Sequence, residues 1–217
     1  MIQFTKAALS WCLGKGQLSL RGNKRRPWLE IVRPETERTY LSYQLFALRR
    51  SHDGPCDDVR DVLSTDTFYD DERIRFQGDG LEAAYGLLYP RDKKVITPQI
   101  MDLVEVPGLT ALWIDNGKIH ANRTGQIKGR YSHEEYEAIA GAMRRHGIEC
   151  RIKMGGSYPF SLNLSAFSME AFARLVRPYA HFSMKAKLQL RKSPPGSGQT
   201  RSQPTDREAN ALLRRVG

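Results

Sequence analysis

The sequence is poor in the residues that build metal centres and disulfide frameworks. It contains three cysteines (Cys12, Cys56 and Cys150) among 217 residues, and no two of them form a Cys-x-x-Cys pair. This usage argues against a zinc site and against a disulfide-stapled fold, and the apolar neighbours of Cys12 and Cys150 favour core positions. The five histidines show no metal-ligand spacing, and no Ser, His and Asp stand in a context that predicts a catalytic triad.

Long apolar runs and phosphate-binding loops are missing as well. No apolar run approaches the ~18 residues of a membrane span, and no signal peptide opens the chain. We therefore expect an intracellular protein without a membrane partner, in the cytoplasm, the nucleoid or an organelle, or encoded by a phage. The Gly14-Lys15-Gly16 and Gly78-Asp79-Gly80 segments lack the further glycines, and the Lys-Ser/Thr pair, of a nucleotide-binding loop.

The sequence has an excess of positive charge. Its 34 Lys and Arg against 24 Asp and Glu give a net charge of +10 and a pI near 9.7. The excess is concentrated in residues 1–50, which carry ten basic residues against three glutamates, a net of +7. Because lysines and arginines that neutralise phosphates drive binding to nucleic acids, we expect a polyanionic partner. A basic protein without such a partner is the alternative that charge alone leaves open.

A short segment occurs twice, near the N-terminus and in the middle of the chain. Aligning Gly16 with Gly117 sets an offset of 101 residues, and at this offset Ser10 falls on Ala111. Small residues recur three positions apart on one helix face in both copies, which lets two helix backbones approach closely. The glycine after each copy suits a helix C-terminus. Since strand, strand and helix patterns follow each copy, the sequence predicts two similar halves that form a pseudo-dimer.

The motifs along the chain resemble those of the single-chain LAGLIDADG homing endonucleases, over residues from about 4 to 190. The segments that carry the resemblance are Leu13-Gly14-Lys15-Gly16-Gln17-Leu18, Tyr89-Pro90, Lys93-Lys94-Val95-Ile96-Thr97-Pro98, Leu112-Trp113-Ile114-Asp115-Asn116-Gly117, Ser132-His133-Glu134-Glu135, Gly147-Ile148-Glu149-Cys150, Leu175-Val176-Arg177-Pro178-Tyr179 and Ser183-Met184-Lys185. The resemblance implies an α+β fold, a pseudo-two-fold pair of αββαββα units. It also implies a monomer with internal pseudo-symmetry and double-stranded DNA as the partner.

This fold divides the chain into three parts. We expect the first half over residues 1–105, the second half over 106–190, and a flexible basic tail over 191–217, where Ser, Pro, Gly, Gln and Arg dominate. The apolar patterns place the two central helices at 4–14 and 107–115. Thr97-Pro98 should begin the helix that runs to about residue 105, and Ser132 should cap a later one. The acidic stretch from Asp53 to Glu72 is expected to be a solvated connector that faces away from DNA.

The expected hairpins carry most of the candidate DNA contacts. In this family the long β-hairpins lie in the DNA major groove, where base edges are read and phosphates fix the register. The basic residues that we assign to this role are Arg21, Lys24, Arg25, Arg26, Arg33, Arg75, Lys118, His120, Arg123, Lys128, Arg130, Arg151 and Lys153.

The catalytic positions are where the sequence departs from the family it resembles. Family members hold divalent metal ions with the acidic residue that precedes each motif glycine, and those ions activate water and stabilise the leaving oxygen. Here these positions hold Lys15 and Asn116, and Asp115 stands one position earlier. Tyr158 stands where a second-half basic residue is expected, whereas Lys94 or its neighbour retains the first-half one. We therefore expect little or no cleavage and no bound metal, with Mg²⁺ needed only if nuclease activity remains.

Three functions stay open at this point. The first is sequence-specific binding of duplex DNA without cleavage. The second is an active endonuclease in which Asp115 or another carboxylate replaces the lost acids. The third is an RNA-binding intron maturase or splicing cofactor that recognises structured RNA.

Overall fold

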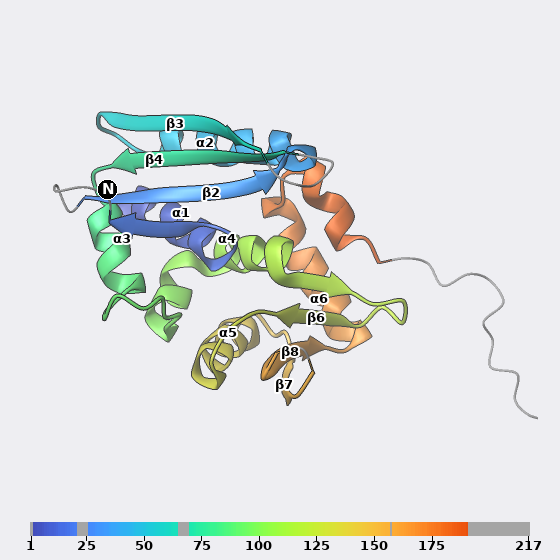
Figure 1. The fold of residues 1–217 in the computed structure, drawn as a ribbon. Coiled ribbons are helices and arrows are strands. Elements are labelled where there is room, and N and C mark those ends of the chain that lie inside the picture. The colour runs from blue at the N-terminus through green and yellow to red at the C-terminus, as the bar shows by residue number, and fades with distance from the viewer. Residues whose placement is uncertain (1, 21–25, 65–69, 157, 191–217) are drawn as a thin grey trace, which may run out of the picture.

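The computed structural model describes residues 2–20, 26–64, 70–156 and 158–190. Each half repeats one plan of helix, hairpin, helix, hairpin, helix (Figure 1). The first half comprises α1 (Ile2–Leu13), β1 (Gln17–Leu20), β2 (Pro27–Pro34), the 3-10 turn η1 (Glu35–Glu37), α2 (Arg38–Ser51), β3 (Cys56–Leu63), β4 (Asp71–Gly78) and α3 (Leu81–Leu88). The second half comprises α4 (Pro98–Asn116), β5 (Gly117–Ile119), β6 (Gly125–Lys128), α5 (His133–Arg145), β7 (Arg151–Met154), β8 (Phe160–Leu164), α6 (Ala166–Val176), and the 3-10 segments η2 (Arg177–Tyr179) and η3 (Phe182–Leu188).

The strands form two antiparallel four-stranded sheets with the same topology. The first sheet has the order β1-β2-β4-β3 and the second has the order β5-β6-β8-β7. The strand that directly follows each motif, β1 or β5, therefore lies at the edge of its sheet. This shared order confirms the expected α+β class with a pseudo-two-fold pair of αββαββα units.

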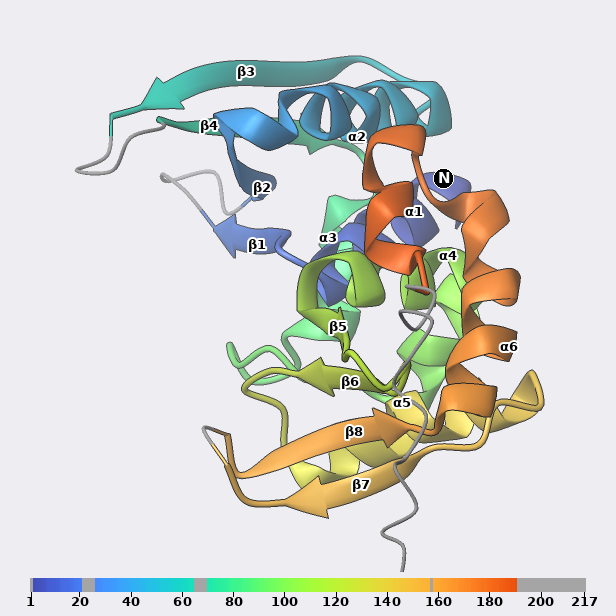
Figure 2. The ribbon, with the colours of Figure 1, turned by 90° about the vertical axis from the view of Figure 1, so that its right-hand side faces the viewer.

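Helices α1 and α4 pack against each other at the centre of the molecule, between the two sheets (Figure 2). Thr97 caps α4 by accepting a hydrogen bond from the Ile100 backbone N–H at 3.3 Å, as the sequence predicted. The backbone leaves the helical conformation at Glu105 (φ 49°, ψ −142°), so α4 consists of two segments joined by a kink. The motif helix thus begins at the kink, where the sequence places the boundary between the halves.

The C-terminal ends of the two motif helices lie against each other. A Cβ atom added to Gly14 would stand 1.9 Å from Asp115 Oδ2, so only glycine leaves room for the facing carboxylate. Ser10 and Ala111 are both buried within the same helix pair, 6% and 1% exposed. The small residues of the repeat therefore serve the close approach that the sequence predicted.

One face of each sheet packs on helices and contributes to the core. In β2, Leu29 and Ile31 are fully buried, while the intervening Trp28 and Glu30 are only partly buried. The second sheet buries Ile127 and Leu162 in the same way. Since side chains alternate along a strand, the opposite face of each sheet, here called its open face, is left to solvent.

The second half follows its sequence patterns closely. Ser132 and Glu135 form a capping box at the start of α5, where the Ser132 hydroxyl accepts from the Glu135 N–H and the Glu135 carboxylate accepts from the Ser132 N–H. The apolar positions predicted for α5 and α6 are buried, namely Tyr136, Ile139, Ala140, Met143, Met169, Phe172, Ala173 and Val176.

The acidic stretch of the first half is the main correction to the expected elements. Within the described part of residues 53–72, β3 occupies Cys56–Leu63 and β4 begins at Asp71, so these residues form paired strands and not a connector. Arg60 and Arg49 pair with carboxylates of this region, so part of its charge is neutralised within the fold. Within the described ranges, no helix is long and apolar enough to cross a membrane.

Candidate nucleic-acid interface

The ends of the two motif helices meet at Asp115, whose side chain is 2% exposed. The Lys15 backbone N–H donates to Asp115 Oδ2 at 2.7 Å, which ties the end of α1 to the end of α4. Arg33 of β2 donates to both carboxylate oxygens, with Nη1 2.6 Å from Oδ1 and Nη2 3.0 Å from Oδ2. A bidentate pair of this kind is among the stronger charge-assisted interactions in proteins. Asp115 is therefore fully engaged within the protein.

Arg33 is buried, which corrects its assignment to the DNA contacts. Its side chain is fully covered and also donates to Glu37 Oε2 at 2.9 Å and to Gln44 Oε1 at 2.9 Å. The guanidinium carbon lies 4.6 Å from the centre of the Tyr40 ring. Burial by itself disfavours the charged guanidinium, but Asp115 and Glu37 more than offset this cost and leave the pKa of Arg33 raised. No phosphate can reach a side chain enclosed in this way.

The pair belongs to a network that also includes the end of the described chain. Lys187 of η3 contacts Glu37, with 3.1 Å between Lys187 Nζ and Glu37 Oε1, and donates to the Ile114 carbonyl at 2.9 Å. Burial tends to raise the pKa of Glu37, but the hydrogen bond from Arg33 and the charge of Lys187 leave it lowered. Sequence reasoning missed this network. The one feature of the sequence that indicates a buried Arg33 is the alternation along its strand, because Arg33 shares a face with the apolar Leu29 and Ile31.

The two substituted catalytic positions flank Asp115. Lys15 has an exposed side chain, whereas Asn116 is partly buried, with its Nδ2 3.4 Å from the Leu112 carbonyl. Lys94 lies close to this point, since its Nζ is 3.4 Å from the Gly16 carbonyl. Burial of Lys94 lowers its pKa, and the charges of Asp115 and Glu135 act in the opposite direction. Two lysines therefore lie at the helix ends, one exposed and one mostly buried.

The groups at the helix ends do not fit a divalent cation. Magnesium and calcium require several oxygen ligands, with carboxylates supplying the charge. Asp115 already accepts from Arg33 and from the Lys15 N–H, and the neighbouring Lys15 carries a like charge to the cation. Across the residues that the structure describes, no group of three or more His, Cys, Asp or Glu could hold a metal ion.

The open face of the second sheet brings together most of the second-half candidates. The strand register aligns Lys118, Gln126, Asn163 and Arg151 in one row across the sheet. A second row contains Lys128, Ser161 and Lys153. Gln126 Nε2 donates to Ser161 Oγ at 3.2 Å and to Asn163 Oδ1 at 3.1 Å, so amides and hydroxyls fill the space between the cations.

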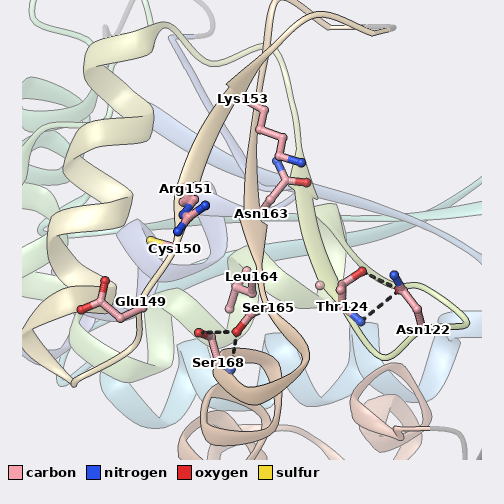
Figure 3. Close-up of a pocket in the computed structure, with 11 residues that line it drawn as sticks. Asn122, Thr124, Glu149, Cys150, Arg151, Lys153, Asn163, Leu164, Ser165 and Ser168 are labelled. Atoms are coloured by element: carbon pink, nitrogen blue, oxygen red, sulfur yellow. Dashed lines mark hydrogen bonds between the residues drawn. The ribbon is translucent and has the colours of Figure 1, made fainter. Parts of the chain in front are cut away.

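A cavity lies beside this face, lined by residues of β7, β8, the β5–β6 turn and the start of α6. Figure 3 shows the side chains of Lys153 on β7 and Asn163 on β8 close together, with Arg151 also on β7. Asn122 and Thr124 of the β5–β6 turn close the other side, joined by hydrogen bonds of 2.7 and 3.3 Å. Cys150 also lines the cavity, but burial raises the pKa of its thiol to about 11, so it is not a reactive group.

The remaining candidates lie in different settings. Arg123, in the β5–β6 turn, pairs with Glu170 at 3.2 Å, and His120 at the same turn is partly buried. Arg130 is exposed and lines a hollow beside Tyr158. Arg75 of the first sheet is held by Asp61, and Arg26 is exposed just before β2. Arg21, Lys24 and Arg25 lie outside the described residues.

In sequence the chain matches the model of one protein family, and in fold it is similar to several solved structures. The model of the LAGLIDADG DNA endonuclease family matches residues 34–172. In fold, the chain is similar to the homing endonuclease I-WcaI bound to its DNA recognition sequence, with a TM-score of 0.69, 15% identity and 88% of each chain covered. It is also similar to I-DmoI in complex with DNA and Ca, with a TM-score of 0.56, 14% identity and 98% of each chain covered.

A third similar structure is full-length DUF199/WhiA from Thermatoga maritima, with a TM-score of 0.53 and 13% identity. The match covers 99% of this chain and 66% of that one. No curated protein is significantly similar to the chain in sequence. The family match extends over more than half of the sequence and agrees with the two-half fold built around the motif helices, which shows that the chain belongs to the LAGLIDADG DNA endonuclease family.

Proposed function

We propose that this protein binds double-stranded DNA and does not cleave it. The observation that carries the proposal is the state of Asp115, the carboxylate at the paired helix ends, which is held by Arg33 and the Lys15 N–H. Cleavage by metal ions requires carboxylates that are free to ligate them. Lys15 and Asn116 stand at the two positions where the family carries its catalytic acids, and neither can take that role.

Binding is supported by the net charge of +10 and by the cations of the second sheet's open face. In the bound state, the exposed Lys15 ammonium contacts a phosphate oxygen directly and supplies the positive charge that a metal ion supplies in a nuclease. Lys94 adds positive charge beneath it. The protein therefore binds duplex DNA without any divalent cation.

The test uses the full chain and duplexes selected by it from a random-sequence library. Binding is measured by gel shift in EDTA, in magnesium and in manganese, and cleavage is measured as linearisation of a plasmid that carries the selected site. We expect equal binding in the three buffers and intact plasmid. Efficient linearisation by the unmodified protein would contradict the proposal in favour of an active endonuclease. Binding to structured RNA without duplex DNA binding would favour the maturase function.

A matched pair of variants isolates the role of the helix ends. The double change Lys15→Asp with Asn116→Asp places two carboxylates against the DNA backbone, so binding should become dependent on a divalent cation. The control Lys15→Asn removes the charge without adding a carboxylate. It should weaken binding equally in all three buffers, because a phosphate contact is lost and no metal ligand is gained. Metal dependence in the control would contradict the direct lysine–phosphate contact.

A further inference from the structure

The open faces of the two sheets carry opposite balances of charge. The second sheet presents four cations, Lys118, Lys128, Arg151 and Lys153, and its strand positions on this face hold no carboxylate. Among the described residues, none of these four side chains has a carboxylate partner within 4 Å. The first sheet presents only two cations on its strands, Arg73 and Arg75, and four carboxylates, namely Glu30, Asp57, Asp61 and Asp71.

The two arginines of the first sheet are also bound within the protein. Arg73 Nη2 lies 3.0 Å from Asp61 Oδ2, and Arg75 Nη2 lies 2.9 Å from the same oxygen. Arg73 further contacts Glu30, with 3.7 Å between Nη1 and Oε2. The hydrogen bond from Arg73 lowers the pKa of Asp61, and the charge of Arg75 adds to this effect. Asp61 therefore stays ionised and holds both guanidinium groups at neutral pH.

These differences affect how each face meets a phosphate backbone. A free lysine or arginine can neutralise a phosphate and release its counterion. An arginine held by Asp61 must first give up that partner, and a phosphate that replaces Asp61 then lies against the released carboxylate. Contacts with the DNA phosphates therefore add little binding free energy at the first face. On the strands of the second face the cations are separated by the uncharged Gln126, Ser161 and Asn163, and Glu149, which lines the cavity beside Arg151, makes no ion pair with them among the described residues. These cations therefore need no such exchange of partners.

We infer that the two sheets contribute unequally to DNA binding, with the second sheet holding the phosphate backbone and Asp61 suppressing phosphate contacts by the first. This inference rests on the proposed binding of duplex DNA. It assigns Asp61 a role in specificity, because a face that gains little binding free energy from phosphates depends on contacts with base edges. A carboxylate on that face can accept a hydrogen bond from the amino group of cytosine and so recognise that base.

The test compares isosteric changes in the full chain on a short fluorescent duplex of mixed sequence, over a series of salt concentrations. Asp61→Asn should tighten non-specific binding by about two- to fivefold at low salt, the range of an exposed ion pair. It should also steepen the salt dependence by about 0.9 on the log–log slope for each phosphate newly neutralised. The matched control is Asp57→Asn on the same strand and face, which removes the same charge but releases no arginine, and it should leave the slope unchanged.

The second arm removes single cations from each face. Lys128→Gln and Lys153→Gln should each flatten the slope by about 0.9, whereas Arg73→Gln and Arg75→Gln should leave it nearly unchanged. An equal reduction of the slope by the variants of both faces would overturn the inference that the two sheets contribute unequally. An equal gain in affinity from Asp61→Asn and Asp57→Asn would overturn it as well. Absence of duplex binding by the unmodified protein would instead overturn the proposed function. Thermal melting of each variant verifies that it is folded.

Discussion

Replacing Asp115 by Asn should destabilise the whole molecule, because the change leaves the guanidinium of Arg33 buried without its main partner. Breaking a buried ion pair by removing one member costs about 3–5 kcal/mol. Glu37 and Gln44 continue to accept hydrogen bonds from Arg33, and the new amide still offers one oxygen. These remaining partners place the expected loss near the lower limit, about 3 kcal/mol. For a chain of this size that corresponds to a melting temperature lower by roughly 6–12 °C.

The assay is urea denaturation followed by fluorescence and far-UV circular dichroism, with a double-mutant cycle. Arg33→Met and the combination Arg33→Met with Asp115→Asn complete the cycle, and the double variant should lose less stability than the sum of the single losses. The control is Glu170→Gln, which breaks the exposed pair with Arg123 and should cost at most about 1 kcal/mol. A loss of less than about 1 kcal/mol for Asp115→Asn would refute the conclusion that the buried Arg33–Asp115 pair stabilises the contact between the two halves.

Three further predictions test the packing and the ionisable groups. Ser10→Leu should cost roughly 1–3 kcal/mol in urea denaturation, because it overfills the contact between α1 and α4, and an unchanged midpoint would contradict that packing. In the native protein a maleimide should modify Cys56 alone, since burial raises the pKa of Cys12 to about 12 and of Cys150 to about 11, and mass spectrometry after proteolysis identifies the modified thiol. Burial acts to raise the pKa of Glu72, but hydrogen bonds from two arginines leave it below its ordinary value of 4.5. The stability that Glu72 contributes is therefore complete above that unfolded value and is lost as the pH falls through the lower folded one, so Glu72→Gln should reduce the acid sensitivity of unfolding measured between about pH 3 and pH 6.

The local chemistry of the sequence determined most of the secondary structure. Ser132 followed by Glu135 predicted the start of α5, and Thr97 with Pro98 predicted the start of α4, because a cap depends on residues within one helical turn. The duplicated motif predicted the central helix pair, since close backbone approach requires small side chains at fixed spacing. Motif order and spacing over the whole chain also predicted the family.

The tertiary structure alone decided which charged side chains are free to bind a partner such as a phosphate. Its place on an expected hairpin put Arg33 among the predicted DNA contacts, yet β2 turns its side chain inward, where it pairs with Asp115, 82 residues away in the sequence. The acidic stretch before Glu72 carried no clear strand pattern, and only pairing with β4 gives Asp61 its position beside Arg73 and Arg75. A charge has the same sign in sequence wherever it lies, but its partners, and therefore what it can bind, are set by contacts between distant segments.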